Sequence, residues 1–307
     1  MELLDGKVVA NTIKDKLKDT LQKTKNTNNL IGLMFNQDIS TGSIPELAVI
    51  QVGDNPASST YVKNKQKACE YVGIRSMPYN LDEDVNDEYL TNLIDSLNHN
   101  KNVNGILVQL PLPKHLNEKK ILSYIDPMKD VDGFHAVNVG KLNLGDKDAF
   151  MPCTPLGICE ILKYYNIDVS GKECVVVGRS DIVGKPMANA LLQMNGTVTV
   201  CHSKTKNLKE ICKRADILIC AIGKPKFFDK DYIKDGAVVI DVGINQGENG
   251  KLCGDVDFDA VKDIVSAITP VPGGVGVMTV AMLMYNCVKA FDKQLRNQLP
   301  AYTQEVL

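Results

Sequence analysis

The hydrophobic pattern of the chain alternates between two periods, one typical of helices and the other typical of strands. In the first third of the chain, the helical period occurs in three stretches: 9–21, about 58–70 and 87–97. Short apolar runs that are typical of buried strands lie among them: 46–52, 74–80 and 105–110. Ser58 and Ser59 are expected to cap the second helix, and Gly73 is expected to end it. This part of the chain therefore predicts a β-α-β-α-β series.

A second series of the same kind begins after the segment Pro152–Pro155. A helix over about 156–165 leads to five apolar runs that predict strands: 173–177, 197–201, 217–222, 237–242 and 265–269. A long apolar helix over 277–295 follows them. Strands that alternate with helices are typical of parallel sheets. We therefore expect an α/β protein of two lobes with a cleft between them, and the second lobe is a Rossmann-like nucleotide-binding domain.

The boundary between the two lobes is expected near residue 150. Residues 1–150 are predicted to form an N-terminal substrate domain that the C-terminal helix 280–307 completes, and residues 151–279 form the nucleotide domain. The stretch 26–45 is rich in Asn, Thr, Ser and Gly, and it is interpreted as a loop or an insertion of unknown role. Residues from Pro300 onward are expected to form a frayed tail.

Composition and charge narrow the class of protein. The 307 residues are 44% hydrophobic and 23% charged, which is typical of a globular protein. The 35 basic and 37 acidic residues nearly balance, so a nucleic-acid partner is not expected. No apolar run reaches the roughly 20 residues of a spanning helix, and the N-terminus does not resemble a signal peptide. The nine scattered cysteines contain no C-x-x-C pair and predict reduced thiols, which is typical of a cytoplasmic protein. The lack of a long apolar run argues against a membrane partner.

The strongest chemical signal is the turn that follows the apolar run 173–177. Gly178, Arg179 and Ser180 lie in this turn, and Pro186 is suited to the first position of the helix that follows. Main-chain N–H groups at such a turn attract phosphate because they are unpaired and lie at the positive end of the helix dipole. The spacing differs from G-x-G-x-x-G, so an ordinary strand-to-helix turn remains the alternative.

The end of the next predicted strand bears on the choice of cofactor. Folds that bind NAD usually place a carboxylate there to bind the ribose 2′-hydroxyl. This chain has His202, Ser203 and Lys204 instead. Arg179 and Ser203 could bind a 2′-phosphate that no carboxylate repels. The segment therefore favours NADP over NAD, with a solvated basic loop as the alternative.

Candidate catalytic side chains lie in the first series. Tyr61 and Lys65 are four residues apart, so they share one face of a predicted helix. A phenol and an ammonium are suited to proton transfer or to polarisation of a substrate. Lys63 and Lys67 make an ordinary solvated helix face the alternative. Gln109 lies at the carboxyl end of a predicted strand, where parallel sheets bind their ligands.

Two loops complete the set of candidate segments. Asp132 lies in the loop Asp130–His135, where turn formation alone would account for both carboxylates. The loop Thr269–Gly276 contains two prolines and three glycines, so its backbone can pass close to a flat ligand, although it could also be a linker. The four histidines are isolated, and no metal site is expected. Neither a G-x-S-x-G elbow nor a P-loop occurs.

These segments, in this order, resemble the bifunctional methylenetetrahydrofolate dehydrogenase / methenyltetrahydrofolate cyclohydrolase family over nearly the whole chain. The motifs that carry the resemblance are Tyr61–Lys65, Val108–Pro113, Asp130–His135, Pro152–Pro155, Gly178–Pro186, Asp241–Asn245, Gly254–Val256 and Thr269–Gly276. Each motif alone is weak, but the collinear set is specific. The stretch 26–45 departs from the family pattern, in which this connection is shorter.

The resemblance implies a role for each candidate residue. Lys65 is implied as the catalytic lysine, Tyr61 as the ring that stacks on the folate, and Gln109 as the residue that orients the lysine. Asp132 is implied as a further residue of the active site, which anchors the amino groups of the pterin. Further substrate contacts are implied for Leu110, Pro272, Gly273 and Gly276, and NADP contacts for Gly178, Arg179, Ser180, Ser203 and Ile244.

The resemblance also implies an activity. The enzyme would oxidise 5,10-methylenetetrahydrofolate with NADP⁺ and hydrolyse the methenyl product to 10-formyltetrahydrofolate, a step of one-carbon metabolism that serves purine biosynthesis. A dehydrogenase without cyclohydrolase activity is the alternative within this class. An NADP-binding protein without turnover, or an NADP dehydrogenase of small cyclic acids, are alternatives from other classes. A homodimer formed through the nucleotide lobe is implied as well.

Overall fold

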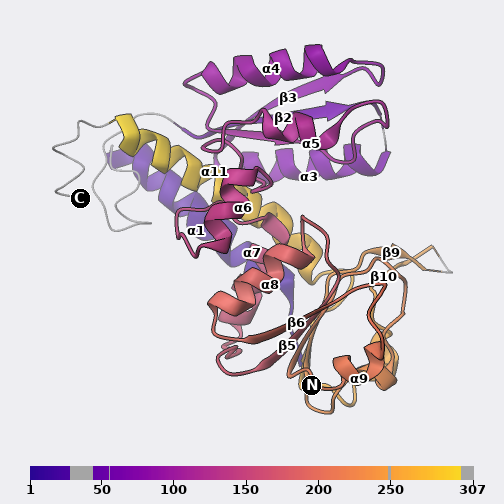
Figure 1. The fold of residues 1–307 in the computed structure, drawn as a ribbon. Helices are drawn as coiled ribbons and strands as arrows, with labels where there is room; N and C mark the ends of the chain where they lie inside the picture. The colour runs from indigo at the N-terminus through magenta and orange to yellow at the C-terminus, as the bar shows by residue number, and fades with distance from the viewer. Residues whose placement is uncertain (28–43, 55, 248–249, 299–307) are drawn as a thin grey trace. The chain divides into compact units, whose positions relative to one another are not determined.

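The computed structural model describes residues 1–27, 44–54, 56–247 and 250–298. Two compact units make up the chain: Met1–Asn11 with Val139–Met282, and Thr12–Asn138 with Leu283–Leu307. We call them the six-stranded unit and the three-stranded unit, after their main sheets. Helices α1 (Gly6–Thr27), α6 (Ala136–Asn143) and α11 (Val275–Gln298) each have residues in both units (Figure 1). Most of the predicted insertion 26–45 and the predicted tail from Pro300 lie outside the described residues.

The three-stranded unit contains a parallel sheet in the order β3-β2-β4. The central strand β2 (Glu46–Val52) is buried along its whole length, between β3 (Arg75–Leu81) and β4 (Gly105–Val108). β2 has the predicted bounds, whereas β4 ends two residues earlier than predicted. Gln109 therefore follows the strand directly, and its main-chain N–H donates to the oxygen of Ile50 at 2.8 Å.

Helices cover both faces of this sheet. α4 (Asp87–His99) and α5 (Glu118–Ser123) lie on one face, and α3 (Pro56–Val72) lies on the other (Figure 1). The core under α4 and α5 is formed by residues such as Ala48, Ile50, Ile94, Leu97, Ile106, Val108 and Ile121. α3 begins at Pro56, so Ser58 and Ser59 lie inside the helix and not at its N-cap as predicted.

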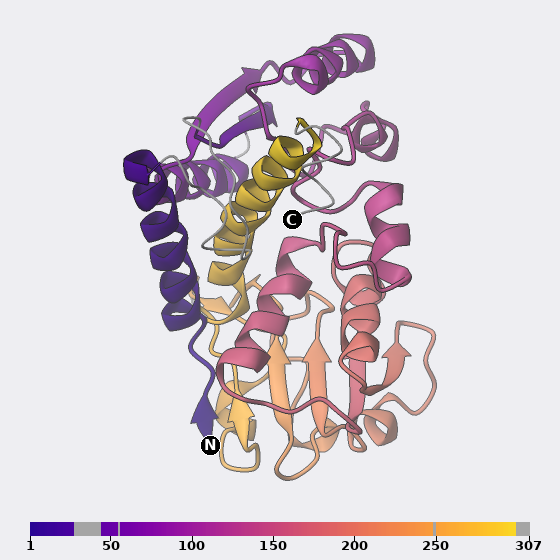
Figure 2. The same cartoon turned by 90° about the vertical axis from the view of Figure 1, so that its left-hand side faces the viewer.

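The six-stranded unit contains a parallel sheet in the order β1-β11-β8-β7-β5-β6 (Figure 2). Its strands are β5 (Glu173–Val177), β6 (Thr197–Cys201), β7 (Ile217–Cys220), β8 (Val238–Asp241), β11 (Ala267–Ile268) and β1 (Glu2–Leu3). The chain runs from β5 outward to β6 and then returns to β7 on the other side of β5. This reversal is the switch point at which open α/β sheets bind ligands. β1 was not predicted because two residues show no periodicity.

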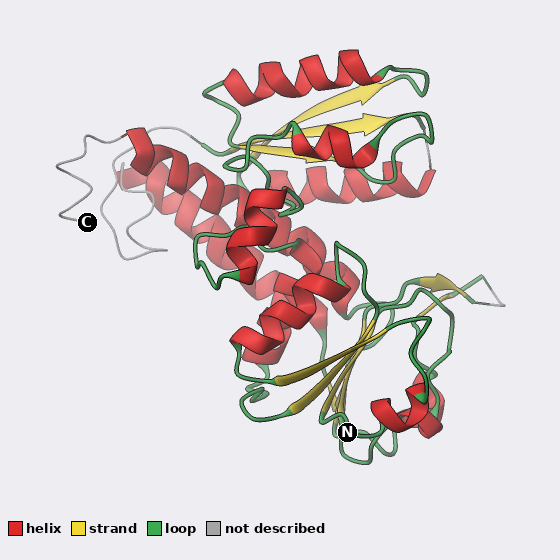
Figure 3. Ribbon diagram, viewed as in Figure 1, coloured by secondary structure: helices red, strands yellow, loops and turns green. Residues whose placement is uncertain are grey.

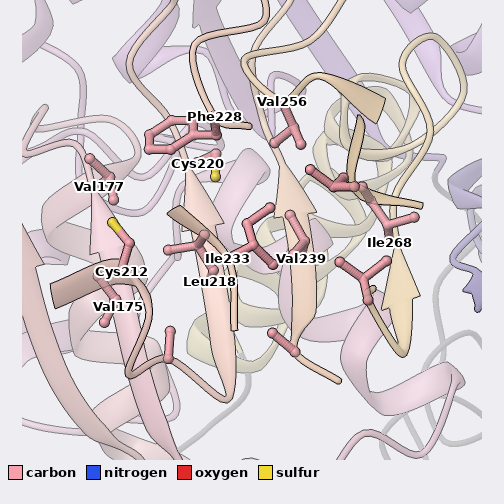
Figure 4. Packing of buried hydrophobic residues seen from close by; sticks show 14 of the residues in the cluster. Val175, Val177, Cys212, Leu218, Cys220, Phe228, Ile233, Val239, Val256 and Ile268 are labelled. Atoms are coloured by element: carbon pink, nitrogen blue, oxygen red, sulfur yellow. The ribbon is translucent and has the colours of Figure 1, made fainter. Parts of the chain in front are cut away.

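Helices also cover both faces of the six-stranded sheet. α7 (Cys153–Tyr164) and α8 (Gly184–Gln193) lie on one side, and α9 (Leu208–Cys212) and α10 (Phe258–Val261) lie on the other (Figures 1 and 3). Figure 4 shows part of the core on the second side, which contains Val175, Val177, Cys212, Leu218, Cys220, Phe228 and Val239. The alternate strand residues, such as Val176 and Ile219, are buried as well. Burial on both faces explains why the strands read as continuous apolar runs.

Two further elements matter for the site. A short antiparallel hairpin, β9 (Asn245–Gln246) with β10 (Leu252–Cys253), follows β8. Among the described helices, α11 is long and apolar enough over Val275–Leu295 to cross a membrane, and 67% of that stretch is buried in the protein. A buried core helix meets the same criterion. The sequence-based expectation missed this stretch because it counted only uninterrupted apolar runs.

Packing of α7 against α11 is tested by Gly157→Ala. A Cβ atom at Gly157 would lie 2.6 Å from the Cβ of Met278, so the two helices have no room for a methyl group. We expect the substitution to lower the free energy of unfolding by about 1–3 kcal/mol, the usual cost of overpacking. Gly140→Ala in α6 is the matched control, because nothing lies within 4 Å of that position. Urea titrations that show equal effects for the two variants would contradict this packing.

Candidate active site

Lys65 and Gln109 form the central polar contact of the three-stranded unit. Lys65 lies on α3 and is only 8% exposed, and its Nζ donates to Gln109 Oε1 at 3.0 Å. The Nε2 of Gln109 donates to the oxygen of Leu110 at 2.7 Å, so the amide oxygen faces the lysine. The side chain of Gln109 therefore holds the ammonium group in one position. Buried and oriented in this way, Lys65 is suited to move a proton.

Tyr61 lies one turn before Lys65 on α3 and is 41% exposed. The four-residue spacing places both residues on the same face of the helix. A tyrosine ring that is open to solvent can stack on a flat ligand. The expected pair is therefore present, with the lysine held in the protein and the ring near the surface.

The loop Asp130–His135 contains two carboxylates in different environments. Asp130 is buried, and its carboxylate accepts N–H groups from Gly133 (3.1 Å) and His135 (2.8 Å) and from the amide of Asn138 (2.8 Å). Burial raises the pKa of Asp130. Asp132 lies between these contacts and is only partly buried. Asp130 therefore shapes the loop on which Asp132 is presented, whereas the sequence pattern treated the two carboxylates alike.

The glycines after β5 and at the start of α8 allow a close approach of main chains. A Cβ atom at Gly178 would lie 2.3 Å from the oxygen of Ala221 after β7, and Gly178 has a φ of +138°. A Cβ atom at Gly184 would lie 2.2 Å from the oxygen of Gly178. The carboxyl ends of β5 and β7 meet here, at the switch point of the sheet. The position expected for a nucleotide is therefore the one that the topology favours.

The main-chain N–H groups at the start of α8 are hydrogen-bonded within the protein, which corrects part of the sequence prediction. Ser180 Oγ accepts the N–H groups of Val183 (3.1 Å) and Gly184 (3.4 Å), and Ser180 O accepts that of Lys185 (3.1 Å). These donors were expected to be unpaired, but a serine hydroxyl near a helix start competes for them. In the described part of the chain, the N–H groups of Arg179, Ser180 and Ile182 donate to no protein acceptor. The donors that fit a phosphate therefore lie in the loop before the helix.

The turn after β6 presents Ser203 to solvent. The N–H of His202 donates to Thr205 Oγ1 (2.8 Å), and the N–H of Lys204 donates to His202 Nδ1 (3.1 Å). Gly178 N donates to the oxygen of Cys201 at 2.9 Å, so the Gly178–Ser180 loop and this turn begin side by side. Arg179 and Ser203 are both exposed, and residues 202–205 contain no carboxylate. These features fit a cofactor with a 2′-phosphate.

Ile244 and Gly276, which the sequence assigned to cofactor and substrate respectively, lie together in the six-stranded unit. A Cβ atom at Gly276 would lie 2.8 Å from Cδ1 of Ile244. Gly276 is near the start of α11, after the loop that contains Pro272 and Gly273. Gly273 has a φ of +109°, and the Val271–Pro272 bond is cis. The side chain of Ile244 therefore packs on bare backbone at the start of α11, which begins at Val275, so the predicted loop ends before Gly276.

A buried aspartate at the end of β8, to which the sequence assigned no role, shapes the segment that carries Ile244. Asp241 is 4% exposed. Its carboxylate accepts the N–H groups of Gly243 (3.1 Å), Asp255 (2.9 Å) and Val256 (2.9 Å). Burial, and to a smaller extent the nearby Asp255 carboxylate, outweigh the three N–H groups, which lower the pKa of Asp241, so that its pKa is raised to about 7.

Asp255 is a second buried aspartate in the same place, with 0% exposure. Its carboxylate accepts three main-chain N–H groups after β7, from Ile222 (2.7 Å), Gly223 (3.0 Å) and Lys224 (2.8 Å). It also accepts Asn245 Nδ2 at 2.9 Å. Both carboxylates are therefore bound by N–H donors.

A sequence signal for these two aspartates existed in the glycines beside them. A Cβ atom at Gly254 would lie 1.8 Å from Asp241 Oδ2, and one at Gly243 would lie 2.2 Å from Asp255 Oδ1. An aspartate that ends a buried strand, followed by glycine two residues later, indicates a carboxylate that turns back onto the main chain. The motif Asp241–Asn245 contains this pattern, whereas in Gly254–Val256 the glycine directly precedes the aspartate.

The predicted site residues are divided between the two units. Tyr61, Lys65, Gln109, Leu110 and Asp132 belong to the three-stranded unit, and the predicted NADP residues with Pro272, Gly273 and Gly276 belong to the six-stranded unit. Among the described residues, no group of three or more His, Cys, Asp or Glu side chains is placed to hold a metal ion.

Comparison with known protein families shows to which family the chain belongs. Residues 4–132 match the catalytic domain of tetrahydrofolate dehydrogenase/cyclohydrolase, and residues 152–295 match its NAD(P)-binding domain. The chain belongs to the tetrahydrofolate dehydrogenase/cyclohydrolase family. It contains both regions of this family, so the polar residues around Lys65 lie in the catalytic domain and the loops after β5 and β6 lie in the NAD(P)-binding domain.

Individual members of this family are similar to the chain over nearly its full length. The bifunctional protein FolD of Lachnoclostridium phytofermentans is 59% identical over 95% of this chain and 98% of its own length. The crystal structure of the bifunctional FolD of Campylobacter jejuni is 50% identical, with a TM-score of 0.89 over 97% of this chain and 100% of its own. That of Trypanosoma brucei, complexed with NADP and an inhibitor, is 36% identical, with a TM-score of 0.86 over 96% of this chain and 98% of its own.

These relatives separate the alternatives that the sequence left open. Bifunctional relatives that are more than half identical over nearly the full length favour the bifunctional enzyme over a dehydrogenase without cyclohydrolase activity. They also favour an enzyme over a nucleotide-binding protein without turnover. Shikimate dehydrogenase of Aquifex aeolicus is only 15% identical with a TM-score of 0.51, so its likeness extends to the fold alone.

The raised pKa of Asp241 predicts a pH dependence of stability. An unfolded aspartate ionises near pH 3.8, whereas Asp241 in the folded protein ionises at about 7. Between these values the folded state holds a proton that the unfolded state has lost, so this group destabilises the fold as the pH rises. Relative to Asp241→Asn, which does not titrate, the wild type should lose stability from about pH 4 to about pH 7 and then stay level.

Urea titrations across this range measure the effect, and Asp216→Asn is the control. A hydrogen bond from Lys234 lowers the pKa of Asp216, so its stabilising contribution is complete above pH 4 and is lost only as the pH falls further. The difference between wild type and Asp216→Asn should therefore stay constant from about pH 5 to 8. A constant difference for Asp241→Asn as well would contradict the prediction.

Proposed function

We propose that this enzyme oxidises 5,10-methylenetetrahydrofolate with NADP⁺ to 5,10-methenyltetrahydrofolate, and that it then adds water to give 10-formyltetrahydrofolate. The observation that carries the proposal is the buried Lys65–Gln109 pair in a chain that matches both the catalytic and the NAD(P)-binding domain. NADP⁺, when bound, accepts the hydride. All other tasks fall to residues of the chain.

Lys65 is the proton-transfer residue of the hydrolytic step. Water adds to the cationic bridge carbon, and its oxygen, which becomes the formyl oxygen, must lose both protons. One proton passes to N5 when the bond between N5 and this carbon breaks, and the other is released. Lys65 Nζ can release and recover a proton, whereas Gln109 keeps it in place through the 3.0 Å hydrogen bond. The low exposure of Lys65 limits competition from bulk water.

Tyr61 and Asp132 bind the folate. The exposed ring of Tyr61 stacks on the pterin or the aryl ring, and the Asp132 carboxylate accepts the N–H groups of the 2-amino-4-oxo pterin edge. The main-chain contacts of Asp130 keep the Asp132 loop in one conformation. Leu110 supports Gln109 through its carbonyl. Pro272 and Gly273, together with Gly276 at the start of α11, form the second substrate segment.

The NADP-binding residues follow β5, β6 and β8. Gly178 permits the main chain to pass the end of β7, and the N–H groups of Arg179 and Ser180 are the donors for a phosphate of the cofactor. The Arg179 guanidinium and the Ser203 hydroxyl bind the 2′-phosphate. Ile244 contributes an apolar contact beside the nicotinamide.

The proposal also includes the oligomeric state, the cellular compartment and the use of the product. We infer a homodimer, which the position of β6 at the edge of its sheet supports, because an open strand edge can pair with a second copy. All nine cysteines are free thiols, which supports the cytoplasm. Folate is the small-molecule partner, and the formyl product supplies formyl-transfer reactions such as those of purine biosynthesis.

The choice of cofactor is tested by Arg179→Ala. Loss of a charge-assisted hydrogen bond costs about 1.5–3 kcal/mol, so the KM for NADP⁺ should rise roughly 10- to 100-fold. The KM for NAD⁺, which has no 2′-phosphate, should change far less. Lys185→Ala removes an equal charge nearby, where Lys185 pairs with Asp181, and serves as the control. If Arg179→Ala weakens both cofactors equally, Arg179 does not bind the 2′-phosphate.

The role of Lys65 is tested by Lys65→Arg. An arginine keeps the positive charge but does not release a proton near neutral pH. Cyclohydrolase activity should fall about 10²–10⁴-fold, the usual contribution of general acid–base catalysis, and dehydrogenase activity should fall less. Hydrolysis of methenyltetrahydrofolate without NADP⁺ measures the first, and formation of NADPH measures the second.

Lys63→Arg is the matched control for this test. Lys63 lies on the same helix and is exposed, so both activities should stay near the wild-type values. If Lys65→Arg hydrolyses methenyltetrahydrofolate at nearly the wild-type rate, then Lys65 attracts the substrate and does not transfer the proton.

A further inference from the structure

Within the six-stranded unit, Ile244 and Gly276 bring a proposed cofactor residue into contact with a proposed substrate residue. A Cβ atom at residue 276 would lie only 2.8 Å from Cδ1 of Ile244, so the isoleucine packs directly on the backbone of Gly276. Ile244 is a proposed cofactor residue, and Gly276, at the start of α11, is a proposed substrate residue. The position of Ile244 therefore bears on the distance between the nicotinamide and the one-carbon bridge.

The segment around Ile244 has little regular structure to hold it. β9 and β10 contain two residues each, and Ile244 itself is 46% exposed. Hairpins of this length are not stable by themselves. Hydrogen bonds to buried side chains must therefore set the position of Ile244.

Asp241 and Asp255 provide these hydrogen bonds from both sides. The residue before Ile244 donates its main-chain N–H to Asp241, and the residue after it donates its side-chain amide to Asp255. The main-chain N–H of Asp255 donates to Asp241 as well, so the two aspartates are linked. Ile244 is thus the exposed residue between two anchored neighbours.

The same two aspartates connect Ile244 to the carboxyl ends of neighbouring strands. Asp255 binds the segment 222–224 after β7. The main-chain N–H of Asp241 donates to Thr269 Oγ1 at 2.8 Å, and Thr269 opens the loop that leads to Gly276. The network therefore reaches both partners of the Ile244–Gly276 contact.

We propose that Asp241 and Asp255 are positioning residues for hydride transfer, which hold Ile244 against Gly276 and so set the place of the nicotinamide beside the folate. The inference rests on the proposed function of this site. Neither aspartate touches the cofactor or the substrate in this scheme. Hydride transfer depends on the distance between two bound molecules, whereas hydrolysis requires the folate alone. The two activities of the enzyme should therefore respond differently when the network is weakened.

Asp255→Asn is the first variant. Asparagine has the shape of aspartate, but its NH₂ group cannot accept an N–H, so either the N–H groups of Ile222 and Gly223 or those of Lys224 and Asn245 lose their acceptor. We expect kcat of the dehydrogenase at saturating NADP⁺ to fall about 10- to 100-fold, since a misplacement of about 1 Å costs this much. Cyclohydrolase activity, assayed with methenyltetrahydrofolate in the absence of NADP⁺, should stay within about twofold of the wild type. NADP⁺ affinity, measured by calorimetry, should weaken less than kcat falls.

Other outcomes overturn the proposal. An equal loss of both activities would mean that Asp255 only stabilises the fold. Unchanged dehydrogenase activity would mean that the network does not set the hydride geometry. A loss of NADP⁺ affinity with an unchanged kcat would reduce the network to a role in binding.

A second set of variants tests the contact directly and does not disturb the buried carboxylates. Gly276→Ala places a methyl group against Cδ1 of Ile244 and should lower the dehydrogenase kcat. Ile244→Val removes Cδ1, so the double variant Gly276→Ala/Ile244→Val should recover most of the lost rate. If the double variant is no faster than Gly276→Ala, the contact does not control hydride transfer.

These experiments also separate this inference from the proposed function. The proposed function fails if the wild type does not reduce NADP⁺ with methylenetetrahydrofolate. The positioning role fails on the responses of Asp255→Asn and the double variant, while the wild type still catalyses both steps.

Discussion

The loops that carry the proposed site depend on one kind of interaction, a buried carboxylate that accepts N–H groups. Asp130 in the three-stranded unit and Asp241 and Asp255 in the six-stranded unit each accept at least three such donors. A buried carboxylate is costly unless its oxygens are hydrogen-bonded, so each one forces several main-chain groups to converge on it. The loops thereby take one conformation although they contain almost no helix or strand.

Close approach of main chains is the second requirement, and it explains several of the glycines. Gly178 lies against the oxygen of Ala221, and Gly254 lies against the carboxylate of Asp241. A side chain at Gly178 would push apart the ends of β5 and β7, where the sheet reverses its order, and one at Gly254 would displace the carboxylate at the end of β8. The carboxylates and the glycines therefore act together, because the N–H groups can reach the oxygens only where no Cβ atom intervenes.

The buried Lys65 is likewise held by a hydrogen bond, but its partner, the amide of Gln109, is neutral. The polar ends of the two side chains meet where β4 has just ended, and the amide of Gln109 is itself held by the carbonyl of Leu110. A lysine with a fixed position and low exposure is suited to proton transfer, whereas the exposed Lys63 is not. One helix therefore presents a catalytic candidate and an ordinary surface lysine two residues apart.

The sequence by itself determined the α/β class, the alternation of strands with helices and the bounds of β2, β5 and β6, because hydrophobic periodicity records which faces are buried. It also determined which residues are candidates for the site, through the order of the motifs. The tertiary structure decided which donors at the start of α8 are already paired by Ser180. It also showed that Asp130 shapes a loop while Asp132 is presented on it, and that Asp241 and Asp255 join the strand ends. These properties depend on contacts between residues far apart in the chain, and periodicity contains no information about such contacts.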